Sequence, residues 1–206
     1  MVRRQDYGMK MNSNIFETDD NSTPLTEEEV QGLIPSWVTL RSELNELESL
    51  GILNAEKWLL TIRRKDLLSE KFIKLLHKKM FEGIWLWAGK FRTTERNIGI
   101  APYAISVELQ KLFDDVNYWV RHETYPIIEI GARFHHRLVY IHPFPNGNGR
   151  HSRLMADLLM KKLKHTPLNW GQGNLIKISE LRKKYINALQ KADKGDYSLL
   201  LEFVQG

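Results

Sequence analysis

Apolar residues recur every three or four positions along most of the chain, which is the spacing of one face of an α-helix. The pattern predicts helices over residues 42–62, 69–80, 106–120, 127–141 and 149–164, and two more that begin near Ser179 and Asp196. Upstream, Thr26 and the glutamates after it are typical of a helix start, and a short turn would end near Gly32. We therefore expect an all-α, mainly helical fold.

One segment departs from the helical spacing. Gly89 interrupts the period after an aromatic stretch, and β-branched residues then surround Asn97 and Gly99. β-branched residues on both sides of a turn-forming Asn and Gly are typical of a hairpin. We predict one small β-hairpin over residues 93–101.

The first 22 residues are polar and rich in Asn, Ser and Asp, which predicts a mobile N-terminal arm over residues 1–22. Residues 23–206 are enough for a single domain with a full core, preceded by a helical extension. No apolar run approaches the roughly 18 residues that span a bilayer, so no membrane segment is expected. The first residues also lack the apolar core of a signal peptide.

The charge and the cysteine count narrow the classes of protein. A net charge of +5 favours an anionic partner: a nucleotide, a nucleic acid or an acidic protein. The basic runs fall in separate segments, and helix-turn-helix or zinc-finger spacing is missing, so a nucleic-acid partner is not expected. There is no cysteine, which excludes disulfides and thiolate zinc sites and fits a reducing, cytoplasmic environment.

The densest group of chemically active residues separates two predicted helices and reads His142-Pro-Phe-Pro-Asn-Gly-Asn-Gly-Arg150-His-Ser-Arg153. The prolines end the first helix. Gly147 and Gly149 allow a positive φ and let a ligand approach the main chain closely. The free N–H groups of the next helix, together with its dipole, form an anion site, and Asn148 offers a side-chain amide there.

Basic side chains occupy the first turn of that helix, where the dipole favours acidic ones. Arg150, His151 and Arg153 would each cost about 0.3–1 kcal/mol in an empty surface helix. A bound polyphosphate would reverse that cost. Arg150 and Arg153 are three residues apart and so share a face, and guanidinium groups suit phosphate oxygens. The pattern therefore indicates a phosphate-binding helix end.

Histidines supply the candidate proton acceptor. His142 lies at the mouth of the loop, and a neutral imidazole there can take a proton from an incoming hydroxyl. His135, His136 and His151 suggest a metal cluster at first sight. Adjacent histidines on a helix point apart, however, and no His-Glu-x-x-His pattern occurs, so we do not expect a zinc site.

These residues resemble the Fic (Fido, Fic/Doc) family, whose motif is His-x-Phe-x-Asp/Glu-Gly-Asn-Gly-Arg-x-x-Arg. The match covers seven positions of this chain: His142, Phe144, Gly147, Asn148, Gly149, Arg150 and Arg153. A weaker likeness extends over residues 40–206. It includes the hairpin segment, which is similar to the family's target-binding flap, with Thr93, Thr94, Ile98 and Gly99. Residues 32–35 and 42–48 resemble the subgroup called mobile mystery protein B.

The resemblance implies a protein adenylyltransferase (AMPylase) that moves AMP from ATP to a Ser, Thr or Tyr hydroxyl of a target protein. His142 would be the general base and Phe144 the anchor of the loop in the core. The main chain of Gly147 and Gly149, with the Asn148 side chain, would hold the α-phosphate. Arg150 would hold the β-phosphate and Arg153 the γ-phosphate. A toxin-like activity with an antitoxin-like regulator is also implied.

Two features modify that expectation. The family's acidic Mg²⁺ ligand is Asn146 here, and a neutral amide oxygen gives up a full charge at a hard cation, so we expect weakened Mg²⁺ binding. Family members are often inhibited by a glutamate of a Ser/Thr-x-x-x-Glu-Gly/Asn helix. Glu27 and Glu46 fit the first five positions of that pattern, but neither completes it, and they are the candidate inhibitory residues.

Other functions stay open at this point. The same fold would also serve a phosphotransferase or another nucleotidyltransferase, which differ in the group that they transfer. Asn146 leaves open a nucleotide-binding module with weakened or no catalysis. A basic nucleic-acid binder is the reading that the scattered charge favours least.

Overall fold

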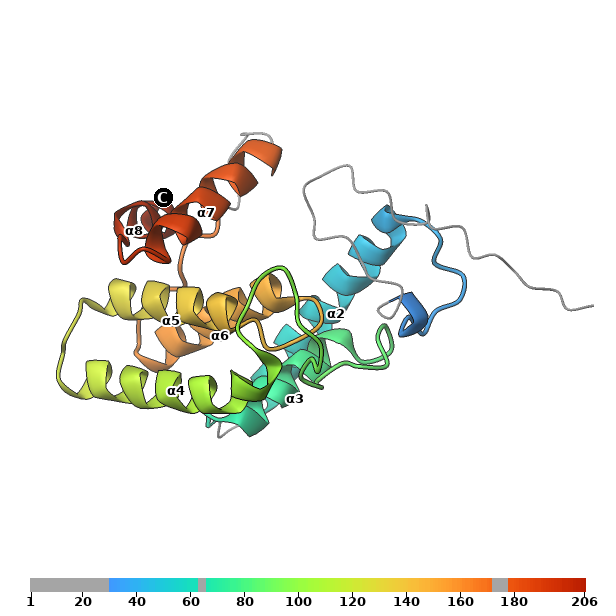
Figure 1. Ribbon diagram of the computed structural model, residues 1–206, viewed down its shortest axis with the longest axis horizontal. Helices are drawn as coiled ribbons and strands as arrows, with labels where there is room; N and C mark the ends of the chain where they lie inside the picture. The colour runs from blue at the N-terminus through green and yellow to red at the C-terminus, as the bar shows by residue number, and fades with distance from the viewer. Residues whose placement is uncertain (1–29, 63–65, 172–177) are drawn as a thin grey trace, which may run out of the picture.

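The computed structural model describes residues 30–62, 66–171 and 178–206. Its helices, in chain order, are α2 (Arg41–Thr61), α3 (Glu70–Phe81), the 3₁₀ turn η1 (Pro102–Ala104), α4 (Ile105–Arg121), α5 (Ile127–Ile141), α6 (Asn148–Lys162), α7 (Ile178–Ala192) and α8 (Ser198–Gln205). The mainly helical fold predicted from the apolar spacing is confirmed (Figure 1). The proposed arm and Glu27 lie outside the described residues.

Helix α5 is the centre of the fold. It packs against α4, α6 and α8, and α7 and α8 lie on the side of α5 away from α4 (Figure 1). Its inward face is fully buried and includes Phe134, Leu138 and Ile141. Because α5 ends at Ile141 and α6 begins at Asn148, the two helices that pack together also present the candidate loop between them.

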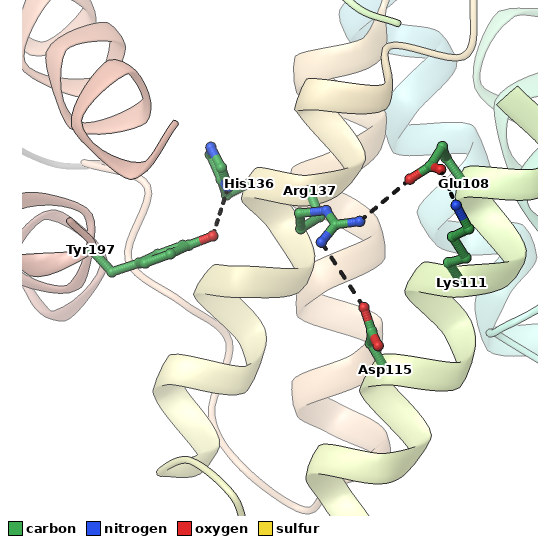
Figure 2. Close-up of polar contacts among 6 residues, drawn as sticks. All are labelled: Glu108, Lys111, Asp115, His136, Arg137 and Tyr197. Carbon is green, nitrogen blue, oxygen red and sulfur yellow. Dashed lines mark hydrogen bonds and ion pairs between the residues drawn. The ribbon is translucent and has the colours of Figure 1, made fainter. Parts of the chain in front are cut away.

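Polar contacts tie α5 to its neighbours on both sides. Arg137 of α5 reaches Glu108 Oε2 at 3.7 Å and Asp115 Oδ2 at 3.9 Å on α4. On the opposite side, His136 Nδ1 lies 2.9 Å from the hydroxyl of Tyr197, the residue before α8. Figure 2 shows these two sets of contacts pointing away from each other across α5. They connect α5 to α4 on one side and to the start of α8 on the other.

Helices α2 and α3 form the other side of the molecule. They pack against each other, and α3 also contacts α4 and α6. Ser69 begins α3 as predicted, with its hydroxyl accepting from the N–H of Phe72 at 3.3 Å. The segment before α2 pairs with the segment after α3 through an isolated antiparallel bridge between Leu33 and Trp85. The N-terminal extension is thus attached beside α3.

The hairpin predicted over residues 93–101 is not confirmed. This segment is described, and it forms an irregular loop with no strand. Arg92 gives the physical reason, because its guanidinium donates to the carbonyls of Thr94 and Ile100. Those carbonyls therefore accept from a side chain and not from a facing strand. Across the described ranges, no helix is long and apolar enough to cross a bilayer.

Candidate active site

The loop between α5 and α6 begins with a strained residue. His142 has φ 52° and ψ 60°, the left-handed conformation that costs a non-glycine residue roughly 1–2 kcal/mol. It ends α5, with its N–H donating to the carbonyl of Leu138 at 3.3 Å. Helix α5 cannot continue past this point, because Pro143 follows. The chain therefore turns sharply at the candidate general base.

Gly147 closes the same loop. Its φ of 76° is left-handed, and a Cβ there would lie 2.6 Å from the Phe81 ring, so only glycine fits. Gly149 lies in α6 with helical backbone, so the positive φ that glycine allows is not used there. A Cβ at Gly149 would meet nothing within 4 Å. Open space thus lies beside the first turn of α6, where the N–H groups have no helical partner.

Ring stacking attaches the loop between α5 and α6 to α3. Phe144 is fully buried and stacks on His77, with ring centroids 3.7 Å apart. His77 also hydrogen-bonds at both ring nitrogens: Nδ1 accepts from the N–H of Gly89 at 3.0 Å, and Nε2 lies 3.1 Å from the carbonyl oxygen of Asn146. Burial lowers the pKa of His77 well below its usual value, so the ring is neutral with its proton on Nε2. His77 therefore fixes the middle of the loop.

The side chain of Asn148 makes two hydrogen bonds within the loop. Its Oδ1 accepts from the N–H of Phe144 at 2.9 Å, and its Nδ2 donates to the Phe144 carbonyl at 2.8 Å. The amide is buried and closes the loop on itself. A five-residue turn in a buried place leaves main-chain groups that need partners, and this side chain supplies both. Asn148 therefore closes the loop, a role that the motif did not predict, and its contact with a phosphate stays a prediction.

Asn146 does not make a metal site with its neighbours. Its Oδ1 accepts from the N–H of Gly147 at 2.6 Å and so is already engaged within the loop. Among the described residues no group of three or more His, Cys, Asp or Glu side chains is placed to hold a metal ion. Mg²⁺ prefers one or two carboxylates together with substrate phosphates. The residues present do not fit a dedicated Mg²⁺ site.

The two arginines of the loop face different helices. Arg150 pairs with Glu48 of α2, with 2.7 Å between Nη2 and Oε2. Arg153 lies over the ring of Tyr185 on α7, 5.8 Å from its centroid. Both side chains are partly exposed. The spacing of three predicts a shared direction, but the two guanidinium groups contact different helices, α2 and α7.

Glu48 is a residue that sequence reasoning missed. Its side chain is buried, and Oε1 accepts from the indole N–H of Trp85 at 3.0 Å. Glu46, the proposed inhibitory residue on the same helix, is exposed. The signal was present: Leu44, Ala55 and Leu59 mark the buried face of α2, and Glu48 falls on that face, four residues after Leu44. A charged residue in an apolar stripe implies a buried partner.

His142 is poised as an uncharged imidazole. Burial, assisted by the positive charge of Arg92, lowers the pKa of His142 to about 4. At neutral pH the ring therefore has a lone pair free to accept a proton. Two other histidines considered for metal binding, His135 and His151, have pKa values lowered to about 3 by burial, and both are enclosed in the core.

The irregular loop over residues 93–100 covers His142. A Cβ on Gly99 would lie 2.6 Å from Cβ of His142, so these two segments of the chain are in contact there. The proposed flap residues Thr93, Thr94 and Ile98 are exposed beside this contact. Two cavities lie elsewhere: one of about 330 Å³ borders α7 and α8, and one of about 540 Å³ borders the turn between α4 and α5.

Comparison with known proteins agrees with this geometry. Residues 67–160, which contain the loop as far as Arg153, match the model of the Fic/DOC family. The protein adenylyltransferase Fic of Nematostella vectensis is 27% identical over 170 residues, which cover 80% of this chain and 38% of that protein. The protein adenylyltransferase fic-1 of Caenorhabditis briggsae is 34% identical over 120 residues, covering 57% and 22%. The chain thus spans well under half the length of these relatives.

Solved structures show the same arrangement of helices. Fic-1 from C. elegans superposes with a TM-score of 0.60 at 26% identity, covering 86% of this chain and 51% of that one. BepC from Bartonella tribocorum, a structure with bound AMPPNP, gives 0.65 at 18% identity and covers 87% and 97%. The family match and the shared fold agree: residues 67–160 of this chain form a domain that matches the Fic/DOC family.

Proposed function

We propose that this protein transfers AMP from ATP to a Ser, Thr or Tyr hydroxyl of a target protein. The observation that carries the proposal is the place of His142. Its neutral imidazole lies six residues before the start of α6 and beneath the exposed loop over residues 93–100. A proton acceptor and a helix end suited to phosphate thus lie at the two ends of one short loop. The names of the similar proteins support the same activity.

The chemistry needs few groups. The imidazole of His142 takes the proton of the target hydroxyl while that oxygen attacks the α-phosphorus of ATP. A bond forms from the hydroxyl oxygen to the α-phosphorus, the bond to the bridging oxygen of the β-phosphate breaks, and pyrophosphate leaves with that electron pair. Positioning and stabilisation of the negative charge that builds up on the phosphates supply most of the rate in such a transfer.

The phosphates are held by the start of α6. The free N–H groups at Gly149 and its neighbours bind the α-phosphate, and the dipole of the helix adds to the attraction. Arg150 binds the β-phosphate once its guanidinium leaves Glu48, and Arg153 binds the γ-phosphate. No step is assigned to Mg²⁺, because Asn146 is the one candidate ligand and is engaged within the loop.

The target lies along the exposed loop. An extended segment of the target protein pairs its main chain with Thr93, Thr94, Ile98 and Gly99, which places its hydroxyl near His142. Residues 23–206 act as one domain with its N-terminal extension. The likeness of residues 32–35 and 42–48 to the mobile mystery protein B subgroup, and an antitoxin-like regulator as a partner, belong to the same proposal.

A second candidate function is a nucleotide-binding module without transfer. Asn146 favours it, because the side chain brings no negative charge for a metal and is engaged with Gly147. This candidate keeps the phosphate site at α6 and gives up the chemistry at His142. The module differs from the AMP transferase in one measurable way: it binds ATP, but no part of a labelled ATP stays attached to protein.

Labelling with two forms of ATP tests the proposal. Protein and cell lysate are incubated with α-labelled or γ-labelled ATP in Mg²⁺ or Mn²⁺, beside His142→Ala and the matched control His122→Ala. His122 is exposed at the end of α4. Label retained from the α position only, lost about 10²–10⁴-fold in His142→Ala and kept in His122→Ala, is expected. Label from the γ position only indicates a phosphotransferase, and binding without label indicates the module.

A further inference from the structure

Arg92 is buried between the two loops of the site. Its Nε donates to the carbonyl of His142 at 2.6 Å, and its Nη2 lies 3.4 Å from the carbonyl oxygen of Ile141. Its own main-chain N–H donates to the carbonyl of Pro143 at 2.9 Å. Three consecutive carbonyls at the end of α5 are therefore oriented by one residue that lies 50 positions away from His142.

The same guanidinium holds the exposed loop. Its Nη1 donates to the carbonyl of Thr94 at 3.1 Å, and Nη2 donates to the carbonyl of Ile100. These two carbonyls lie near the two ends of the segment whose Gly99 touches His142. A Cβ on Gly99 would also lie 2.8 Å from Nη2 of Arg92. The loop, the guanidinium and the histidine are thus in mutual contact.

The shape of arginine is what makes this arrangement possible. A planar fork with five N–H groups can serve several carbonyls in fixed directions, whereas an ammonium group is a point charge on a flexible chain. The carbonyl oxygens at the end of a helix lack helical partners and attract a cation. Arg92 contacts the carbonyls of Ile141, the last residue of α5, and of His142, which stays in a backbone conformation that is unfavourable by itself.

We propose that Arg92 is a positioning residue that holds His142 in its left-handed conformation and fixes the loop over residues 93–100 against it, so that the target loop and the proton acceptor keep one mutual geometry. The claim that this geometry serves catalysis rests on the proposed function. The claim that Arg92 holds His142 and the loop is independent of that function. A target that docks on the loop therefore meets an imidazole already in place.

The first experiment compares Arg92→Lys with the wild type by two readouts. NMR titration of the His142 ring, without nucleotide, reports its surroundings. Labelling kinetics report kcat and KM separately. Lysine keeps the charge and loses the fork, so the pKa of His142 should rise from about 4 toward the ordinary value near 6.5 as the loop opens. In the kinetics, kcat should fall about 100-fold, with KM for ATP changed less.

Arg137→Lys is the matched control. Arg137 is a partly buried arginine that reaches Glu108 and Asp115 across α4 and α5, and neither loop depends on it (Figure 2). Both readouts should stay at their wild-type values in this variant. A folded Arg92→Lys protein in which His142 titrates as in the wild type and kcat is unchanged overturns the proposal.

Gly99→Ala tests the same geometry from the other side, and it covers the case in which Arg92→Lys does not fold. The added methyl group would meet Cβ of His142 and Nη2 of Arg92, so the loop must move off while the guanidinium stays. The His142 titration should shift in the same direction as in Arg92→Lys. No shift would overturn the proposal. The wild-type protein could also fail to label any target while the pKa of His142 still shifts in the variants. That result would support Arg92 as the positioning residue and would count only against the transferase function.

Discussion

The carboxylate of Glu48 and the guanidinium of Arg150 are 2.7 Å apart, and this pair joins α2 to the first turn of α6. Glu48 is buried, whereas the Arg150 side chain is 26% exposed. The arginine that the proposed function assigns to the β-phosphate is thus already neutralised by a carboxylate of the same chain. A phosphate that approaches Arg150 has to compete with that carboxylate.

Replacing Glu48 by glutamine should therefore tighten ATP binding. Glutamine keeps an oxygen for the indole N–H of Trp85 and removes the charge that holds Arg150. We expect the Kd for ATP to fall about tenfold, or ~1.4 kcal/mol, by isothermal titration calorimetry. Glu56→Gln is the matched control at an exposed position of α2 and should change nothing. Weaker ATP binding in Glu48→Gln would mean that the carboxylate orients Arg150 for the phosphate.

Acid should destabilise the fold below about pH 6.5. Burial lowers the pKa values of His135 and His151 to about 3 and that of His77 well below normal, so the unfolded chain takes up protons that the folded one refuses. Their stabilisation is complete above about pH 6.5 and falls as pH decreases, by ~1.4 kcal/mol per pH unit for each histidine. Burial raises the pKa of Asp157 to about 6, which acts in the opposite direction. Urea unfolding at pH 7.5 and 5.5 measures the difference, and equal stability at both values would contradict this account.

Removing the Asn148 side chain should cost stability even without nucleotide. Asn148→Ala leaves the N–H and the carbonyl of Phe144 buried without partners, at about 1–3 kcal/mol for each such group. Thermal unfolding of the nucleotide-free protein measures this loss. Asn45→Ala, an exposed position on α2, should be neutral. If Asn148 served only the ligand, the empty protein would unfold at its normal temperature.

Aspartate at position 146 should raise the affinity for Mg²⁺. The change supplies the full negative charge that a hard cation prefers and that the amide lacks. The midpoint of the Mg²⁺ dependence of ATP binding should move to lower concentration in Asn146→Asp. Asn169→Asp, far along the chain near the start of α7, serves as a control for added charge. An unmoved midpoint in Asn146→Asp would argue against a metal role for this position.

Proline at position 98 should block target modification while ATP still binds. Proline removes the main-chain N–H with which Ile98, an exposed residue, would pair with an extended target. Labelling of targets in lysate and the Kd for ATP are measured on the same preparation. An unchanged Kd for ATP and an unchanged thermal unfolding temperature of Ile98→Pro control for a general effect on folding. Normal labelling by Ile98→Pro would exclude main-chain pairing at that residue.

The helices were accessible to sequence reasoning because their signals are local. The predicted ends agree with the observed ones within two residues, since apolar spacing and Ser69 report on neighbours along the chain. The loop contacts were not accessible. Arg92 meets His142 across 50 residues, and His77 meets Asn146 across 69, and no local pattern encodes such pairs.

The hairpin that did not form and the loop-closing role of Asn148 share one physical cause. The residues around Asn97 and Gly99 have hairpin propensities, but Arg92 supplies the partners of the loop carbonyls from one side chain. Asn148 has an amide suited to a ligand, yet the turn beneath it needed the same hydrogen bonds. Propensity and motif describe what a residue can bind, and packing decides which partner it meets.

The contact of Arg153 with Tyr185 has a consequence for the C-terminal helices. Tyr185 also bonds Nε2 of His135 at 2.8 Å, so this ring stands between α5, α6 and α7. A terminal phosphate that binds the guanidinium of Arg153 would remove its contact with Tyr185, which is one of the interactions that attach α7. Binding of the terminal phosphate by Arg153 would then weaken the attachment of α7 and α8 to the rest of the fold. Faster proteolysis or hydrogen exchange at α7 in the presence of nucleotide would show this.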